Sequence, residues 1–322
     1  MDSTQSNPKA MAKGLFLATV GAIAFSGKAI IVKLAYRHGV DAVTLIMLRM
    51  LFAMPFFVAM VVWSQRKAQR ITSAGSGVHD DATRRMAAAL TFREWLGVAW
   101  LGLTGYYLAS FLDFAGLQYI SASLERLILY LNPTIVLVLG LVLYRKKVNA
   151  MQALGMAVSY AGVLLVFGHE ASLSGRDVGL GALLVLLSAI SYAVYLSYSG
   201  EMVKRLGSMR LVGLATTVAC FLCIVQFVLL RPLQSVLDVA PQVLWLSLFN
   251  AVFCTVVPVL LVMMAIERIG AGLAAQAGMI GPMSTILMGV LILGEPMSRW
   301  VVIGTVFVLA GVAVCSRSAR KT

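Results

Sequence analysis

The chain has 322 residues, of which 60% are apolar and 12% are charged, and its mean hydropathy is +0.91. This composition excludes an ordinary soluble domain. A formal net charge of +13 would suggest a nucleic-acid partner in a soluble protein, but here it follows from membrane topology, so no nucleic acid is expected.

The apolar residues form continuous runs of about 20 residues, the length that a helix needs to cross the hydrocarbon core of a bilayer. Strands of a membrane barrel would instead alternate apolar and polar residues over about ten positions. The sequence therefore predicts an all-α polytopic membrane protein with ten transmembrane helices. In chain order these cover residues 14–35, 42–63, 94–115, 120–144, 149–168, 178–200, 209–230, 241–265, 271–293 and 299–316.

Basic residues predict the orientation of these helices. Most of the 26 Lys and Arg residues fall in segments that share a side with the N-terminus. Short cytoplasmic loops carry such an excess, so both termini of a multi-pass protein of the cell membrane are expected in the cytoplasm. The cytoplasmic segments would include an N-terminal tail 1–13, a loop 64–92 and a C-terminal tail 317–322. Membrane lipids with anionic headgroups are the expected partners of this face.

An internal repeat appears when residues 117–165 are aligned without a gap to residues 266–314. Pro133 then meets Pro282, and three glycines also align, among them Gly155 with Gly304. Further upstream, Gly39 lies opposite Gly207. Two repeats of five spans each, 14–168 and 178–316, must enter the membrane from opposite sides, which predicts inverted topology. Oppositely oriented halves are typical of carriers, because they give inward-open and outward-open states of similar energy.

Several short motifs, in addition to the repeat, carry a resemblance to a known family. They are Gly116-Leu117-Gln118-Tyr119-Ile120-Ser121-Ala122, then Asn132-Pro133 with a following apolar run, and Gly294-Glu295-Pro296 leading into Val302-Ile303-Gly304 and Ala310-Gly311-Val312. Over nearly its whole length the sequence resembles the EamA-type carriers of the drug/metabolite transporter superfamily.

The resemblance implies ten spans in two inverted halves, a central cavity, and export or uptake of amino acids or similar metabolites. One position departs from the family. The first half carries Arg145-Lys146-Lys147 where the family often repeats the Gly294-Glu295 pair of the second half. Basic residues there would help to hold this turn in the cytoplasm, and no role is assigned to Glu295.

Ionisable residues inside spans are costly unless they face a cavity or a partner, so they are the first candidates for a site. Lys28, Arg49, Glu125 and Arg126 are such residues, whereas Asp113 is expected near the interface. In one hypothesis these groups hold the ends of a zwitterionic solute, with Glu125 binding a proton or an ammonium group and Arg49 or Lys28 binding an anion. In the other, they form ion pairs that fix helix packing, and Lys28 extends to the outer interface.

Polar residues on neighbouring helical faces complete the predicted substrate site. Tyr130 shares a face with Arg126, and Asn132 shares one with Glu125. Asn132-Pro133 and Gly281-Pro282 are expected to break two helices at matching positions, and broken helices often line a transport site. Tyr192 and Tyr195 belong to a polar stripe at helical spacing, and Asn250 lies near the middle of its span. Cavity lining and ordinary helix packing are both open for these three residues.

The sequence therefore predicts a secondary transporter that moves an amino acid or a related zwitterionic or polar solute by alternating access. Efflux is the expected direction, driven by the substrate gradient or by the proton motive force, with Glu125 as the favoured titratable site. A flippase for a lipid-linked substrate and an accessory membrane subunit are the alternatives. A membrane-embedded enzyme is disfavoured, because its acidic metal cluster or His-based site is missing from the spans. The four cysteines lie in apolar spans, so no metal or cofactor is expected. The oligomeric state is left open.

Overall fold

The computed structural model describes residues 8–73, 89–145, 149–174 and 177–319, and every regular element in these ranges is helical. Eight helical segments are long and apolar enough to cross a membrane. Two shorter apolar helices, Gly281–Leu293 and Arg299–Cys315, stand beside them. Large apolar side chains such as Phe16, Leu164 and Leu229 remain exposed on these helices. A lipid environment accepts such faces, whereas water would not, so the predicted all-α polytopic membrane fold is confirmed.

The first half of the chain supplies five spans, two of which are broken into shorter helices. They consist of α1 (Pro8–Tyr36), α2 (Ala42–Ser73), α4 (Phe92–Gly102), the π-helical segment η1 (Leu103–Leu108), α5 (Ala109–Gly116), α6 (Ala122–Leu129), α7 (Asn132–Tyr144) and α8 (Ala150–Ser174).

The second half supplies five more spans, again with breaks. They consist of α9 (Asp177–Leu206), α10 (Ser208–Leu230), the 3₁₀ turn η2 (Leu233–Val236), α11 (Pro241–Ala251), the π-helical segment η3 (Val252–Val256), α12 (Val257–Ala277), the 3₁₀ turn η4 (Gly278–Ile280), α13 (Gly281–Met288), the π-helical segment η5 (Gly289–Leu293) and α14 (Arg299–Ala319).

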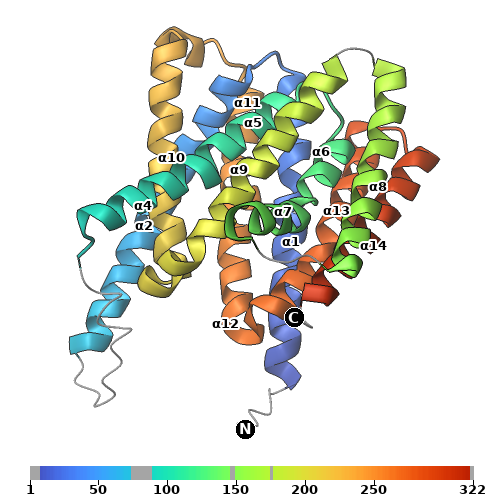
Figure 1. Ribbon diagram of the computed structural model, residues 1–322. Helices are drawn as coiled ribbons and strands as arrows, with labels where there is room; N and C mark the ends of the chain where they lie inside the picture. Colours follow the sequence, from blue (N-terminus) through green and yellow to red (C-terminus); the bar gives the residue numbers. More distant parts are fainter. Residues whose placement is uncertain (1–7, 74–88, 146–148, 175–176, 320–322) are drawn as a thin grey trace.

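The start of α1 and the end of α14 lie toward the same end of the bundle (Figure 1), which we call the lower end. The upper end contains the end of α1 and the turns 37–41, 117–121, 231–240 and 294–298. α1 and α9, the first helices of the two halves, run in opposite directions in Figure 1. This arrangement is the one that two inverted five-span repeats require.

Contacts between the halves repeat when the halves are exchanged. α1 packs mainly against α12, and α9 packs in the same way against α5 and η1, so the first span of each half contacts the third span of the other. α2 packs against α10, and α8 packs against α14, which pairs the second spans and the fifth spans. Gly39 and Gly207, aligned by the repeat, both adopt left-handed backbone conformations with φ of 77° and 78°, which only glycine adopts without strain.

Prolines open two helices at matching positions. Pro133 lies in the first turn of α7, after a break at Tyr130 and Leu131, and Pro282 lies in the first turn of α13, after η4. Proline fits the first turn of a helix because its missing N–H would have no partner there. The predicted breaks are therefore present, and they separate α6 from α7 and α12 from α13.

Several predicted boundaries differ from the structure, and α1 already begins at Pro8, inside the expected tail 1–13. Residues 64–73 of the expected loop 64–92 continue α2, and the expected ends of spans eight and nine, 265 and 271, lie inside α12. A charged residue such as Arg268 ends an apolar run at the membrane surface, but it does not interrupt backbone hydrogen bonds, so the helix continues. Residues 1–7, 74–88, 146–148 and 320–322 lie outside the described ranges. These residues include parts of both predicted tails, most of the predicted loop 64–92, and Lys146-Lys147.

Small residues allow α8 and α14 to touch at the backbone. A Cβ atom added to Gly162 would lie 2.6 Å from the carbonyl oxygen of Gly304, and one added to Gly311 would lie 2.4 Å from that of Gly155. Both distances are too short for a carbon–oxygen contact, so this close approach depends on glycine.

We expect Gly162→Ala to lower the free energy of unfolding by about 1–3 kcal/mol, because the added methyl group overpacks the α8–α14 contact. Gly168 is a matched control on the same helix, since a Cβ atom there would meet nothing within 4 Å. Gly168→Ala should leave stability unchanged or raise it by up to about 1 kcal/mol through helix propensity. Denaturant unfolding in detergent micelles measures both; equal stabilities of the two variants would contradict this packing.

Candidate functional site

A cavity of about 430 Å³ lies between the two halves. α1, α2, η1, α5, α6 and α7 line it from the first half, and α9, α10, η3, α12 and η4 line it from the second. Such a volume lies within the range of about 300–1,000 Å³ that small-molecule sites occupy. The polar side chains on its wall are those of Lys28, Arg49, Tyr106, Ser110, Asp113, Arg126, Tyr130, Asn132, Ser188, Tyr192, Thr216 and Thr255.

Lys28, Asp113 and Glu125 form a buried ionic cluster beside the cavity. Lys28 Nζ lies 2.5 Å from Asp113 Oδ2 and 3.6 Å from Glu125 Oε1. The three residues come from α1, α5 and α6, and their exposed fractions are 8%, 2% and 0%. Charges taken out of water need partners, so this cluster fixes three helices of the first half against one another.

Two sequence-based expectations change here. Asp113 was expected at the interface, but it is buried, lines the cavity and provides the closest partner of Lys28. Lys28 itself points to that carboxylate and does not extend to the outer interface. Glu125 is fully buried, does not line the cavity and lies behind Lys28. Glu125 pairs with Lys28, which lines the cavity, and the substrate-contact role that we predicted for Glu125 stays a prediction.

Arg126 and its neighbours connect the cavity wall to the second half. Arg126 Nη2 donates to Ser26 Oγ at 3.0 Å, and Ser26 Oγ donates to the Gly281 carbonyl oxygen at 2.9 Å. Tyr130 and Asn132 line the cavity at the break between α6 and α7, where Asn132 Nδ2 donates to the Leu129 carbonyl oxygen at 2.7 Å. The helix break thus brings three predicted site residues onto one wall.

Three tyrosines form an aromatic group beside the cavity. Tyr192 stacks on Tyr195 with ring centroids 5.5 Å apart, and the hydroxyl groups of Tyr195 and Tyr106 lie 3.2 Å apart. Tyr192 and Tyr106 line the cavity, whereas Tyr195 lies behind them. A Cβ atom at Gly105 would lie 2.4 Å from the Tyr195 ring. η1 can therefore approach α9 only because this position is glycine.

π-Helical segments leave backbone carbonyls that need donors, and nearby hydroxyl groups supply them. Ser191 Oγ on α9 donates to the Thr104 carbonyl oxygen in η1 at 2.7 Å. In the second half, Thr255 Oγ1 in η3 donates to the Asn250 carbonyl oxygen at 3.0 Å. Thr255 lines the cavity, but the Asn250 side chain is buried away from it. The structure thus gives Asn250 a place behind the wall, and its predicted contact with substrate stays a prediction.

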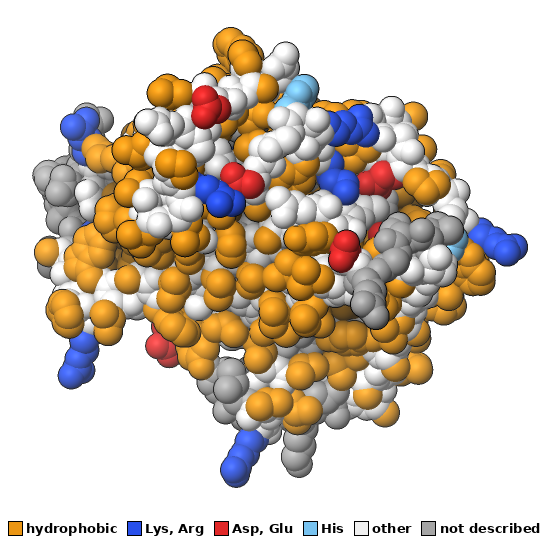
Figure 2. All heavy atoms as spheres, turned by 90° about the horizontal axis from the view of Figure 1, so that it is seen from above, with side chains coloured by type: hydrophobic (Ala, Val, Ile, Leu, Met, Phe, Trp, Pro, Cys, Tyr) orange, Lys and Arg blue, Asp and Glu red, His pale blue; other side chains and the backbone are white. Residues whose placement is uncertain are grey.

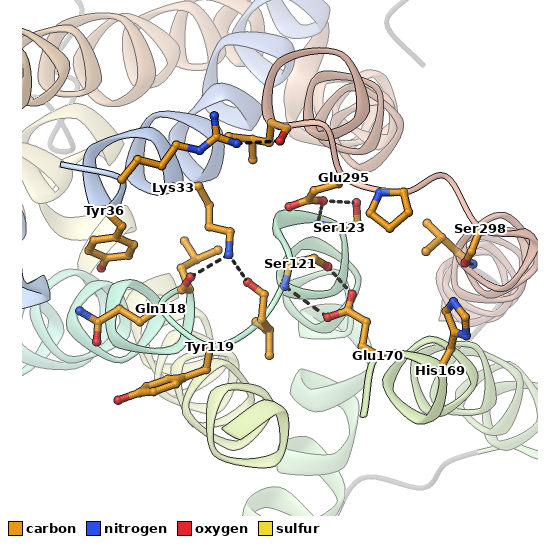
Figure 3. A pocket seen from close by; sticks show the side chains of 16 residues that line it. Lys33, Tyr36, Gln118, Tyr119, Ser121, Ser123, His169, Glu170, Glu295 and Ser298 are labelled. Carbon is orange, nitrogen blue, oxygen red and sulfur yellow. Dashed lines mark hydrogen bonds between the residues drawn. The ribbon is translucent and has the colours of Figure 1, made fainter. Parts of the chain in front are cut away.

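A second pocket of about 500 Å³ lies at the upper end, and Figure 3 shows its side chains. Figure 2, which looks onto this end, shows acidic and basic side chains interspersed among apolar ones. Glu295 Oε1 accepts from the Ala122 N–H at 2.7 Å, and Glu295 Oε2 accepts from Ser123 Oγ at 2.8 Å. A carboxylate at a helix N-terminus stabilises it, so Glu295 of the second half caps α6 of the first.

Lys33 and Glu170 hold the turn that precedes α6 (Figure 3). Lys33 Nζ donates to the carbonyl oxygens of Leu117 at 3.3 Å and Ile120 at 2.8 Å. Glu170 accepts from both the N–H and the hydroxyl group of Ser121, the N-cap residue of α6. No sequence signal identified Glu170 or Glu295 as partners of this turn, because their contacts depend on how the fifth and ninth spans are placed.

Asp41 caps α2 and binds the second half at the same end. Its Oδ1 accepts from the Val43 N–H at 3.0 Å and lies 3.3 Å from Arg231 Nη2. Burial opposes ionisation of this carboxyl group, but hydrogen bonds from Thr44 and the charge of Arg231 outweigh that effect and lower its pKa.

We expect Asp41→Ala to lower the free energy of unfolding at neutral pH by about 1 kcal/mol, because the N-cap is lost. Since the pKa of Asp41 is lower in the folded protein than its unfolded value of about 3.9, this contribution is present above about pH 4. It should disappear as the pH falls through the folded-state pKa. Unfolding curves of wild type and variant between pH 3 and pH 7 measure the difference. A difference that grows toward low pH would contradict the assignment.

The fold and this cavity define a class: an all-α polytopic membrane protein with a charged cavity between two five-span halves. Residues 12–168 and again 179–317 match the EamA-like transporter family. The chain belongs to that family and is a membrane transporter, as its sequence resemblance indicated.

Relatives of known sequence agree with this assignment. The chain is 30% identical over 316 residues to "Uncharacterized transporter YcbK" of Bacillus subtilis (strain 168), which covers 95% of both chains. It is 22% identical over 290 residues to an "Uncharacterized transporter" of Archaeoglobus fulgidus, covering 89% of this chain and 92% of that one. A solved crystal structure of a protein aligns with 96% of this chain and 98% of its own, with a TM-score of 0.61. At 16% identity this last likeness concerns the fold alone.

Proposed function

We propose that this transporter is a secondary carrier that moves a small polar metabolite across the cell membrane by alternating access between the halves 14–168 and 178–316. The observation that carries the proposal is the cavity of about 430 Å³, because both halves line it. A solute bound there contacts both halves, so rocking one half against the other can expose it to either side of the membrane.

Contacts between the halves close the upper end of this path. Glu295 caps α6, Arg37 Nη2 donates to the Leu293 carbonyl oxygen at 2.7 Å, and Arg231 pairs with Asp41 at 3.3 Å. Each contact joins a residue of one half to a residue of the other. Opening the upper end requires that these contacts break, and a few charge-assisted hydrogen bonds are of the strength that a conformational switch needs.

The cavity extends from the ionic cluster toward the lower end. Phe57 lies eight residues after Arg49 on α2, about 12 Å farther down, and both residues line the cavity. Val212 lines it from the first turns of α10, near the lower end. This conformation therefore suits a solute that loads from below.

We further propose that the lower end is cytoplasmic, with both termini on that side. Exposed basic residues support this orientation, since Lys13, Arg66 and Arg268 all lie near the lower end. The conformation described here is then inward-facing. A cavity that loads from the cytoplasm suits efflux of a small polar solute.

Proton coupling would use the ionic cluster. Lys28 lies between two carboxylates, Asp113 and Glu125, and protonation of either one removes a partner from Lys28. A change in the charge of a buried cluster shifts the balance between states that bury it differently. A proton bound at Glu125 would thus change the charge around Lys28 and, through Lys28, the electrostatic potential in the cavity.

Cysteine labelling tests the inward-facing state. We expect Ser110→Cys, on the cavity wall, to react with a membrane-impermeant maleimide from the lower face only. Gln118→Cys, exposed at the upper end, should react from the upper face only, and the four native cysteines, all buried, give the background. Adding Glu295→Ala should raise labelling of Ser110→Cys from above severalfold, because the cap on α6 is lost. Labelling of Ser110→Cys from above in otherwise wild-type protein would contradict the proposed closure.

Transport in proteoliposomes tests the coupling. A solute is first chosen by a thermal-shift screen of amino acids, nucleobases, sugars and organic acids, because a ligand of the folded state raises its apparent stability. Glu125→Gln should then reduce the stimulation of uptake by a pH gradient about tenfold or more. Glu201→Gln, which changes an exposed carboxylate on α9, should respond as the wild type does. An undiminished response of Glu125→Gln to the gradient removes Glu125 from the coupling mechanism.

A further inference from the structure

Arg49 is a buried cation without an acidic partner. It lies on α2, is 3% exposed and lines the cavity. Its Nε and Nη2 atoms have no hydrogen-bond partner in the described part of the chain. The guanidinium group lies 4.5 Å from the centre of the Phe114 ring. This cation–π contact holds the group in place but leaves hydrogen-bond donors unused.

The carboxylates nearby are already engaged by Lys28. Asp113 and Glu125 lie 2.5 Å and 3.6 Å from Lys28 Nζ. Among the described residues, the ion pairs include neither Arg49 nor Arg126. Arg126 donates to the neutral Ser26 hydroxyl group. Arg49 and Arg126 are therefore cations of the cavity wall without an acidic partner, and Arg49 has two unpartnered nitrogen atoms where Arg126 has one, its Nε.

Charge balance gives the sign of the missing partner. Lys28, Arg49 and Arg126 carry three positive charges, and Asp113 and Glu125 carry two negative charges when ionised. The cluster then has one excess positive charge. Protonation of either carboxylate increases the excess, and arginine does not lose its proton in proteins.

We propose that the ligand of this cavity is a small organic monoanion whose carboxylate binds the Arg49 guanidinium group in a bidentate pair. This inference rests on the proposed carrier function and names its substrate class. A carboxylate matches the planar donor pair of arginine and supplies one negative charge. With both carboxylates ionised, a phosphate dianion would leave an excess of the opposite sign, and a zwitterion without net charge would leave the excess uncompensated. The rings of Phe25, Tyr130 and Tyr192, also on the wall, would contact the apolar part of the anion.

The unpaired state of Arg49 also predicts a trade-off between stability and binding. A buried ion without a partner is destabilising in the empty protein. If Arg49 is present for ligand binding, its replacement should leave the ligand-free protein at least as stable as the wild type. If Arg49 serves packing alone, its replacement should destabilise the protein and leave ligand selectivity unchanged.

The test uses full-length protein in nanodiscs of zwitterionic phosphatidylcholine. Dissociation constants are measured for acetate, butyrate, benzoate, phenylacetate and phenylpropionate, each against its primary amide, and for phenylalanine and phenethylamine. We expect at least one carboxylate to bind about tenfold or more tightly than its amide, since charge-assisted hydrogen bonds are lost with the charge. The same carboxylate should also bind more tightly than phenylalanine and phenethylamine.

Three variants locate the effect. Arg49→Gln should abolish the preference for the carboxylate without lowering the melting temperature of the ligand-free protein. Arg49→Lys, which keeps the charge but loses the planar donor pair, should bind the carboxylate with intermediate affinity. Arg66→Gln, which removes an exposed arginine from the same helix, should bind as the wild type does.

The outcomes separate this inference from the carrier function. If no carboxylate binds more tightly than its amide, or if Arg49→Gln keeps the preference, the anion site is refuted. Counterflow of solute in proteoliposomes is then measured independently. If a neutral or zwitterionic solute shows counterflow and no carboxylate is preferred, the carrier function is supported and the anion site is refuted. If a carboxylate binds in a way that depends on Arg49 but shows no counterflow, the anion site is supported and alternating access is refuted.

Discussion

The cost of placing charge inside a membrane is the constraint on which the rest of this structure depends. Five ionisable residues lie together in the middle of the molecule, and hydrocarbon surrounds the bundle that holds them. Lys28 meets two carboxylates, whereas Arg49 lies against an aromatic ring and the cavity. The cavity is needed in part because these ionised groups are stable only in contact with water, with solute or with each other. A fully apolar interface between the halves would exclude such groups.

A turn between two spans and a break within one span place these groups where they can meet. The turn between α5 and α6 directs the N-terminus of α6 toward the Glu295 carboxylate and brings Glu125 behind Lys28. The break before Asn132 brings Tyr130 and Asn132 to the cavity wall. Both places leave backbone groups without a partner inside the helix: Asn132 satisfies one at the break before α7, and Glu295 from the other half satisfies one at the start of α6. Local structure and the contact between the halves are therefore stabilised together.

The two halves are similar in backbone but differ in charge. Gly294 has a left-handed conformation with φ of 72°, and Arg145, which the repeat aligns with it, has φ of 51°. The turn is thus retained at the lower end although glycine and the following Glu are replaced by basic residues. An ion pair joins the halves near each end, Asp41 with Arg231 above and Glu94 with Arg205 below. The Glu295 cap belongs to the upper end, and this difference in charge gives the two ends of a symmetric fold unequal closures.

The sequence alone determined the class, the fold and its approximate spans. A helix that crosses hydrocarbon needs a long apolar run, and aligned Pro and Gly residues reveal the repeat. It also identified Lys28, Arg49 and Arg126 as residues at the cavity, since charge in a span needs a polar surrounding. Only the tertiary structure decided which charges are paired: Asp113 rather than Glu125 lies closest to Lys28, and Glu295 serves as a cap. The physical reason is that these pairings depend on the rotation of each helix about its axis. The π-helical segment η1 and the turn before α6 change that rotation at positions where composition and periodicity give no signal.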